Sequence, residues 1–236
     1  MAELSTSAVA WDRDRVAVRA IWVRANESVE WIAAATDTFV KGLRDLLDVP
    51  EWIDVTSSPW PGEVDAQQQH VRENLVAYEG RVAVGSGCDI SLYGATPPSP
   101  QLTIHAGAIT PGNRIPLHYA GLGFHPQSTP LSRREVVDDL IALAVRACQP
   151  AVVTFTTTAV NKESGRTGWQ VPAGYRVWIG PEVGGISTTA DGVTARPLEG
   201  GTLLSAPDDW EASAVAEAMN ATLEANHLDE IPHGAA

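Results

Sequence analysis

The chain has few of the features that would place it outside the cytoplasm. Its 236 residues include 2 cysteines, Cys88 and Cys148, which are too few for a disulfide framework, and their apolar surroundings are typical of buried free thiols. The N-terminus lacks a basic patch followed by an apolar stretch. No run approaches the ~20 apolar residues that a membrane helix needs. We therefore expect a cytoplasmic protein with no disulfide and no membrane partner.

Basic residues are also scarce. Lysine occurs only as Lys41 and Lys162, and the formal net charge is -13. Surfaces that bind nucleic acid combine clustered basic side chains with aromatic rings, and the sequence has no such stretch. An acidic surface repels the phosphate backbone. We therefore expect no nucleic-acid partner.

The acidic excess is confined to two segments. Residues 27–79 carry 11 acidic and 3 basic residues, and residues 200–236 carry 7 acidic residues and no lysine or arginine. Such segments are commonly solvated faces that keep a protein soluble. They can also steer a basic partner toward the protein. The charge pattern alone leaves both explanations open.

Motifs that mark catalytic or nucleotide-binding sites are missing. The sequence has no Gly-x4-Gly-Lys-Ser/Thr phosphate loop and no Gly-x-Ser-x-Gly elbow, and GSGCDIS at residues 85–91 lacks the third glycine of a dinucleotide fingerprint. Neither cysteine has a histidine nearby in sequence to stabilise a thiolate. We therefore expect no catalytic residue and no cofactor, which favours a binding protein over an enzyme.

The histidines leave one alternative open. His105 and His118 fall on neighbouring predicted strands, so a metal-dependent or hydrolytic site could form around them. A metal site would need a further ligand such as Asp89 or His125. No two histidines have ligand spacing on one helix, and packed or surface histidines are the simpler interpretation. We therefore expect no metal ion.

Hydrophobic periodicity and capping signals predict helices and strands in separate runs. Helices are predicted from Asn26 or Ser28 to about Asp48, over 63–78, over 129–150 with a Ser132–Glu135 capping box, and from Asp208 or Asp209 to near Asn226. Strands are predicted over 14–25, as a meander within 81–119, and over 151–160, 174–180 and 200–206. This segregation indicates an α+β fold, with an antiparallel or mixed sheet and helices on one side.

The domain organisation follows from the same pattern. We expect residues 1–13 to be a flexible N-terminus, residues 14–226 to form a single α+β domain, and residues 227–236 to be a C-terminal tail. A break near residue 125 could divide the domain into two halves.

The junction between the first strand and the first helix gathers unusual residues. In AIWVRANESVEW, an apolar run ends in Trp22 and Arg24, and Glu27 suits the positive end of the helix dipole. The structural interpretation is that Trp22 is buried on the strand and Arg24 pairs with Glu27 or another carboxylate. The functional alternative is that Arg24 and Glu27 line an exposed groove that meets a partner.

An ordered set of stretches resembles the immunity protein 52 family of bacterial polymorphic toxin systems. The stretches, spanning roughly residues 14–225, are IWVRANESVEWIAAATDTFVKGL, VAVGSGCDISLYGA, NRIPLHYAG, QPAVVTFTT, GYRVWIGPEV and GGTLLSAPDDW. The family's Trp-x-x-Arg-x-x-Glu-Ser-like motif would correspond to Trp22, Arg24, Glu27 and Ser28, with slightly variable spacing. The chain departs from the family at a late Gly-Trp step, where it has Gly174 and Tyr175.

The resemblance implies an α+β protein that binds a cognate toxin inside the producing cell and neutralises it without catalysis. The family is often found beside nuclease toxins of the restriction-endonuclease-like type. The charge pattern fits independently, because a nuclease site must attract phosphate and is therefore electropositive. The oligomeric state is left open.

Two acidic surfaces are candidates for binding such a partner. The first comprises Asp45, Asp48, Glu51 and Asp54, with Trp52 and Trp60 as possible aromatic anchors. The second is the start of the C-terminal helix, with Asp208, Asp209 and Glu211. Besides the enzyme already considered, a structural or adaptor module of a secretion or phage-related assembly is the remaining alternative.

Overall fold

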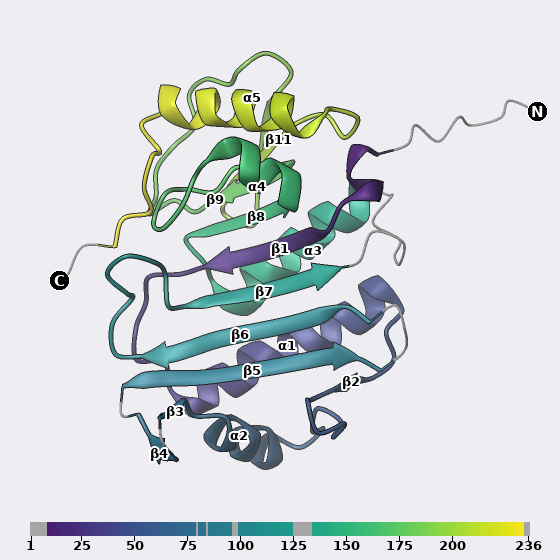
Figure 1. Cartoon of the computed structure of the whole chain (residues 1–236), viewed down its shortest axis with the longest axis vertical. Coiled ribbons are helices and arrows are strands. Elements are labelled where there is room, and N and C mark those ends of the chain that lie inside the picture. Colours follow the sequence, from purple (N-terminus) through teal and green to yellow (C-terminus); the bar gives the residue numbers. More distant parts are fainter. Residues whose placement is uncertain (1–8, 79, 84, 96–98, 125–133, 234–236) are drawn as a thin grey trace, which may run out of the picture.

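One antiparallel sheet organises the chain. The computed structural model describes residues 9–78, 80–83, 85–95, 99–124 and 134–233 (Figure 1). Nine of its strands form the sheet in the order β10-β11-β9-β8-β1-β7-β6-β5-β2. The strands are β1 Val16–Ile21, β2 Trp52–Ile53, β5 Ser86–Gly94, β6 Gln101–Ala108, β7 Tyr119–Phe124, β8 Val152–Thr157, β9 Arg176–Ile179, β10 Thr194–Leu198 and β11 Gly201–Ser205. A separate hairpin pairs β3 Ala77–Tyr78 with β4 Arg81–Val82.

The helices cover the two faces of the sheet unequally. They are α1 Val29–Leu47, α2 Val64–Glu73, α3 Arg134–Cys148, α4 Thr158–Ser164 and α5 Ala212–Ala225, and a short 3-10 turn, η1, spans Ala10–Arg13. Figure 1 shows α1 and α3 behind the sheet, α4 and α5 in front of its upper part, and α2 at its lower edge. The α+β class is confirmed, and the expected one-sided cover describes α1 and α3 but not α4 and α5.

The burial of the strand side chains reflects which faces of the sheet the helices cover. In β6 and β7 every second side chain is buried and the others are half-buried, which is the pattern of a sheet with one covered face. In β8 and β9 every side chain is buried, because α3 packs on one face and α4 and α5 lie over the other. The front of β1, β7, β6 and β5 is therefore the open face of the sheet.

The two halves suggested by the sequence share this one sheet. β1 pairs with β7 on one side and with β8 on the other, so strands from before and after residue 125 meet at the N-terminal strand. Residue 125 itself lies outside the described residues. A division there would have to cut through a continuous hydrogen-bonded sheet.

Several predicted elements have different bounds. The second helix ends at Glu73, and the chain then forms the β3–β4 hairpin. The stretch NRIPLHYAG is loop up to its tyrosine, where β7 begins. The predicted strand over 151–160 ends at Thr157, whose hydroxyl accepts a hydrogen bond from the Val160 amide and so caps α4. The Ser132–Glu135 capping box cannot be placed, because Ser132 lies outside the described residues.

Both expected terminal segments contribute to the core. Trp11, in the segment expected to be flexible, is 2% exposed and packs edge-on against Phe155 and Tyr175. In the C-terminal segment Leu228 and Ile231 are buried. Apolar burial of this kind holds both segments on the domain from Val9 to the last described residues.

Candidate partner-binding site

The polar side chains at the junction after β1 find their hydrogen-bond and ion-pair partners within the protein. The side chain of Glu27 is 1% exposed. Its carboxylate accepts hydrogen bonds from Trp22 Nε1 at 2.6 Å and from the Gly107 amide at 2.8 Å, and it lies 3.6 Å from Arg24 Nε. Ser28 caps α1 by accepting a hydrogen bond from the Trp31 amide. Buried carboxylates need such partners, so Glu27 fixes the entry of the chain into α1.

Arg24 extends this cluster to α3. Its guanidinium lies over the Trp31 ring, 4.3 Å from the ring centroid, and donates to the Cys148 carbonyl at the end of α3. These contacts place Trp22, Arg24 and Glu27 in a structural network, as the structural interpretation expects. Arg24 keeps 38% of its side chain exposed.

His118 is buried behind the sheet beside Glu27. Its Nε2 lies 3.9 Å from Glu27 Oε2, and its ring is nearly parallel to that of Trp22 at a centroid distance of 6.3 Å. Neither ring nitrogen has a hydrogen-bond partner among the described residues. Burial lowers the pKa of His118, and the charge of Glu27 opposes this shift. The neutral imidazole is therefore favoured in the folded protein.

His105 lies on the other face of the sheet. Its Nδ1 is 3.2 Å from Asp89 Oδ1, and its ring stacks on Tyr119. His105 and His118 therefore do not share a site, and His125 lies outside the described residues. Within the described part of the chain, no group of three or more His, Cys, Asp or Glu side chains could hold a metal ion.

The cysteines are not activated. Both are buried, and burial raises the pKa of Cys88 and that of Cys148 to about 12. A thiol with so high a pKa carries almost no thiolate near neutral pH, and thiolate is the nucleophilic form.

The first candidate surface lies at the β2 edge of the sheet, near the end of α1 and near α2 (Figure 1). Asp45, Asp48 and Glu51 are exposed, and Asp54 is half-buried. Among the described residues none of the four forms an ion pair with lysine or arginine. Burial would raise the pKa of Asp54, but hydrogen bonds from Thr56 and from the Ser58 amide outweigh it and hold the pKa below its usual value.

The two tryptophans of this segment are not on the surface. Trp52 is 0% exposed and Trp60 is 5% exposed, and Trp60 Nε1 lies 3.4 Å from Asp37. Both rings belong to the core. Trp60 packs edge-on against His70 of α2, and Trp52 lies on β2, which pairs with β5. The expectation of aromatic anchors therefore needs correction, and we leave both residues out of the binding surface.

An acidic hollow adjoins this surface. It encloses about 540 Å³ between the 54–58 turn, α2 and β5. Its charged and titratable lining consists of Asp54, His70, Glu73 and Asp89, and the remaining lining residues are neutral. The topology brings Asp89 here from β5, and no local pattern marks its approach to Asp54.

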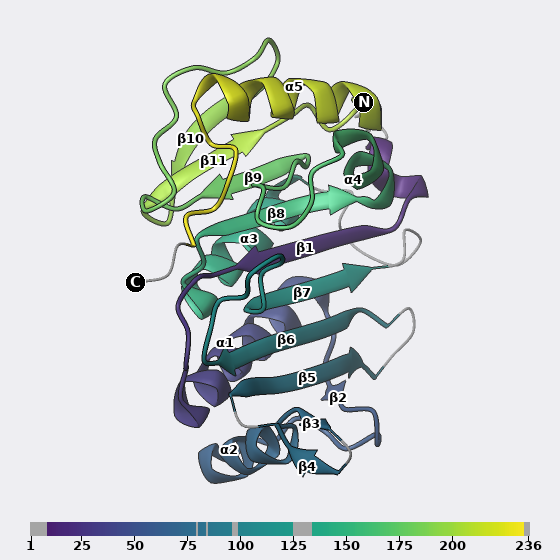
Figure 2. The same cartoon turned by 60° about the vertical axis from the view of Figure 1, so that its left-hand side comes forward.

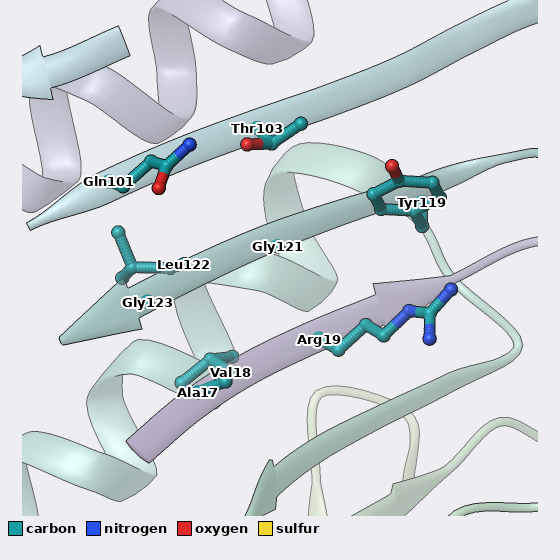
Figure 3. A pocket seen from close by; sticks show the side chains of 9 residues that line it. All are labelled: Ala17, Val18, Arg19, Gln101, Thr103, Tyr119, Gly121, Leu122 and Gly123. Carbon is teal, nitrogen blue, oxygen red and sulfur yellow. The ribbon is translucent and has the colours of Figure 1, made fainter. Parts of the chain in front are cut away.

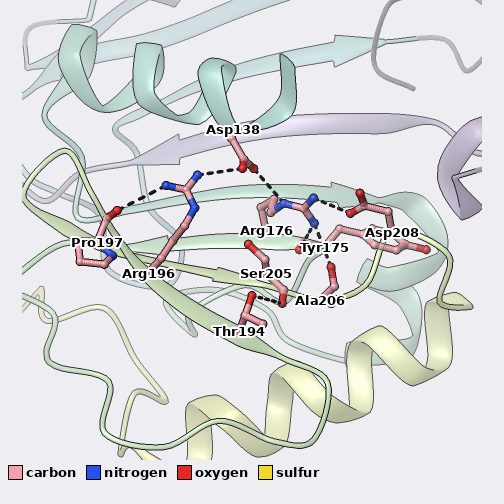
Figure 4. Close-up of polar contacts among 9 residues, drawn as sticks. All are labelled: Asp138, Tyr175, Arg176, Thr194, Arg196, Pro197, Ser205, Ala206 and Asp208. Atoms are coloured by element: carbon pink, nitrogen blue, oxygen red, sulfur yellow. Dashed lines mark hydrogen bonds and ion pairs between the residues drawn. The ribbon is translucent and has the colours of Figure 1, made fainter. Parts of the chain in front are cut away.

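The second candidate surface is divided between the core and the surface. Asp208 pairs with the fully buried Arg176, whose guanidinium also contacts Asp138 and two backbone carbonyls (Figure 4). Asp209 and Glu211 are exposed. Figures 1 and 2 place α5, which begins beside them, at the opposite end of the sheet from α2. The two candidate surfaces are therefore separate.

A third feature, missed in the sequence, is a hollow on the open face. It encloses about 250 Å³ and is lined by Ala17, Val18, Arg19, Gln101, Thr103, Tyr119, Gly121, Leu122 and Gly123 (Figure 3). Arg19 lies opposite Gly121 in the register of β1 and β7. Its guanidinium carbon is 4.9 Å from the centroid of the Tyr119 ring. We call this feature the glycine hollow.

Comparisons with known proteins give little. No family model matches the chain, and no curated protein matches it. Among solved structures it is similar to "Pseudomonas aeruginosa T6SS protein PA0821", with a TM-score of 0.45 and 10% identity over 92% of this chain and 78% of that one. A likeness this weak carries no argument about function. No described helix is both long and apolar enough to cross a membrane.

Proposed function

We propose that this chain is an immunity protein that neutralises a cognate bacterial toxin by stoichiometric binding in the cytoplasm of the producing cell. The observation that carries the proposal is the acidic end of the molecule. There, Asp45, Asp48 and Glu51 are exposed and have no basic partner among the described residues.

The electrostatic argument concerns the partner. Carboxylates that are not neutralised within the protein create a negative potential, and a complementary positive surface associates faster because of it. The adjacent acidic hollow adds Glu73 and Asp89 to the same end. A nuclease toxin must be electropositive where it holds phosphate, so the proposed toxin is a nuclease. The ordered resemblance to the immunity protein 52 family supports the same assignment.

The proposed mechanism is binding alone. Arg24 and Glu27 are engaged within the protein, and both thiols have raised pKa values. In this mechanism the protein occupies or covers the active site of the toxin and needs no cofactor.

Co-expression tests the proposal most directly. We expect a toxin-like domain to be encoded beside this gene. That domain is the probe, expressed in a bacterium with and without the full chain, with survival and DNA integrity as readouts. We expect rescue and a one-to-one complex on a sizing column. Failure of both rescue and complex formation would overturn the proposed function.

Charge reversal locates the surface. The variant Asp45→Lys, Glu51→Lys and Glu73→Lys changes three exposed side chains and leaves Asp48, in a left-handed C-cap, and the turn-forming Asp54 unchanged. We expect its association rate with the toxin to fall by roughly 10-fold or more at low salt. Stopped-flow mixing at two salt concentrations measures this effect.

The matched control reverses three exposed acids at the other end: Asp209→Lys, Glu217→Lys and Glu224→Lys. This control changes the net charge by the same amount as the first variant. We expect only a small, salt-sensitive decrease in its association rate, because the reversed charges lie far from the proposed interface. A larger decrease in the control would move the interface to α5.

A further inference from the structure

Two glycines in the middle of β7 are not required by the fold. Neither Gly121 nor Gly123 has a positive φ. A Cβ atom on Gly123 would meet nothing within 4 Å, and one on Gly121 would meet only Tyr119 Cδ2 at 4.0 Å. Glycine weakens a strand interior, and it often marks a place where a ligand or another chain approaches closely.

Strand-region glycines elsewhere in the sheet have clear reasons. A Cβ atom on Gly174 would lie 2.3 Å from the Phe155 carbonyl oxygen, and one on Gly201 would lie 2.4 Å from that of Ile179. In those places packing excludes a side chain. In β7 the missing side chains instead leave the glycine hollow open on the front of the sheet (Figure 3).

Arg19, in the wall of this hollow, has unused hydrogen-bond donors. The guanidinium lies over the Tyr119 ring, which leaves its N–H edges free. It forms no hydrogen bond or ion pair with any described residue, although the chain has 29 acidic residues. An arginine fork matches a carboxylate with two parallel hydrogen bonds.

We propose that the glycine hollow receives one acidic side chain, Asp or Glu, from the protein partner. This inference rests on the proposed function for the source of that side chain. Arg19 supplies one positive charge, and the polar lining residues Gln101, Thr103 and Tyr119 supply neutral groups. The single positive charge of Arg19 can neutralise one carboxylate. A polyanion would be repelled by the protein's net charge of -13. The partner thus places basic groups on the acidic end and one acid in the hollow.

Nuclear magnetic resonance tests the ligand chemistry without the toxin. The probe is N-acetyl-glutamate methylamide, with N-acetyl-glutamine methylamide as the neutral control and acetate as the bare anion. We expect saturable shifts of the Gly121 and Gly123 amide signals and of Arg19 Nε–H, with a Kd on the order of 1–10 mM for the glutamate probe. The Arg19→Gln variant should abolish them. No saturable shift, or an equal response to the glutamine probe, would overturn the proposal.

Affinity for the toxin-like domain tests the source of the side chain. We expect Gly123→Val, which fills the hollow, and Arg19→Gln each to weaken binding by about 10-fold or more. The controls are Gly185→Val, also with open space around its Cβ position, and Arg114→Gln, both at exposed sites outside the hollow. They should change the Kd by less than about two-fold.

The outcomes separate the two proposals. A complex whose Kd is unchanged in Gly123→Val and Arg19→Gln would overturn the inference and leave the proposed function intact. Binding of the glutamate probe with no toxin complex would support the ligand class and overturn the proposed function. Weakening by Gly123→Val alone would exclude an acidic occupant.

Discussion

The half of the sheet around β8 and β9 is covered on both faces of those strands, whereas β1, β7, β6 and β5 are covered on one. Each half contains an arginine whose environment reflects this difference. Arg176 is fully buried and uses its guanidinium on Asp138, Asp208 and two carbonyls. Arg19 stands on the open face without a carboxylate among the described residues.

The comparison separates stability from binding. In the covered half a charged group persists only when every hydrogen-bonding position is satisfied, because burial without partners is costly. On the open face the Arg19 guanidinium has no carboxylate partner among the described residues, so it can meet one from another chain. We therefore expect substitutions in the covered half to change the free energy of unfolding, and those on the open face to change binding.

The two arginines should give the largest contrast. Arg176→Met leaves Asp138 and Asp208 without their shared partner, and we expect it to reduce the free energy of unfolding by about 3–5 kcal/mol. Arg19→Met should change it by less than about 0.5 kcal/mol. Urea unfolding of both variants measures the difference. Equal losses would contradict the division between the halves.

A pair of glycines gives the next contrast. Gly174→Ala forces a Cβ atom against the Phe155 carbonyl and should cost about 1–3 kcal/mol. Gly123→Ala has open space and should be neutral, or should stabilise by about 0.5–1 kcal/mol because alanine loses less backbone entropy. Thermal and urea unfolding together test this. A clear loss in Gly123→Ala would show that the fold itself needs that glycine.

The buried His118 should make a smaller, pH-dependent contribution to the free energy of unfolding. Because burial lowers the pKa of His118 in the folded state, the unfolded chain binds this proton more readily. The stabilising effect is present above the unfolded pKa of about 6.5 and is lost as the pH falls below it. His118→Phe keeps the ring stacked on Trp22 and should flatten this part of the pH profile. Urea unfolding between about pH 7 and pH 5 compares the two proteins, and identical profiles would contradict the assignment.

Local patterns were sufficient for much of the fold. The first strand, predicted over 14–25, spans Val16–Ile21, and Ser28, one of the two N-cap candidates, caps α1. Alternation and N-cap chemistry are properties of a few adjacent residues. The start of α4 was missed, since the β-branched Thr158 and Val160 continue the pattern of a strand beyond Thr157. The predicted meander ends at residue 119, where β7 begins, so most of this glycine-containing strand was missed; glycine has low strand propensity.

The candidate sites divide in the same way. The sequence identified the acidic segments, but only the fold showed that Trp52 and Trp60 are buried and that Asp208 is paired with Arg176. The glycine hollow combines residues from β1, β6 and β7. No local signal marks such a site, because its members meet only through strand pairing.

The amino-acid sequence by itself determined the α+β class, the acidic charge and most helices and strands, because these depend on composition and on short-range periodicity. The tertiary structure decided which face of each strand is covered, which charges are paired and where a hollow remains. These properties depend on sheet order, register and helix packing, which join residues more than a hundred positions apart, such as Arg24 and Cys148.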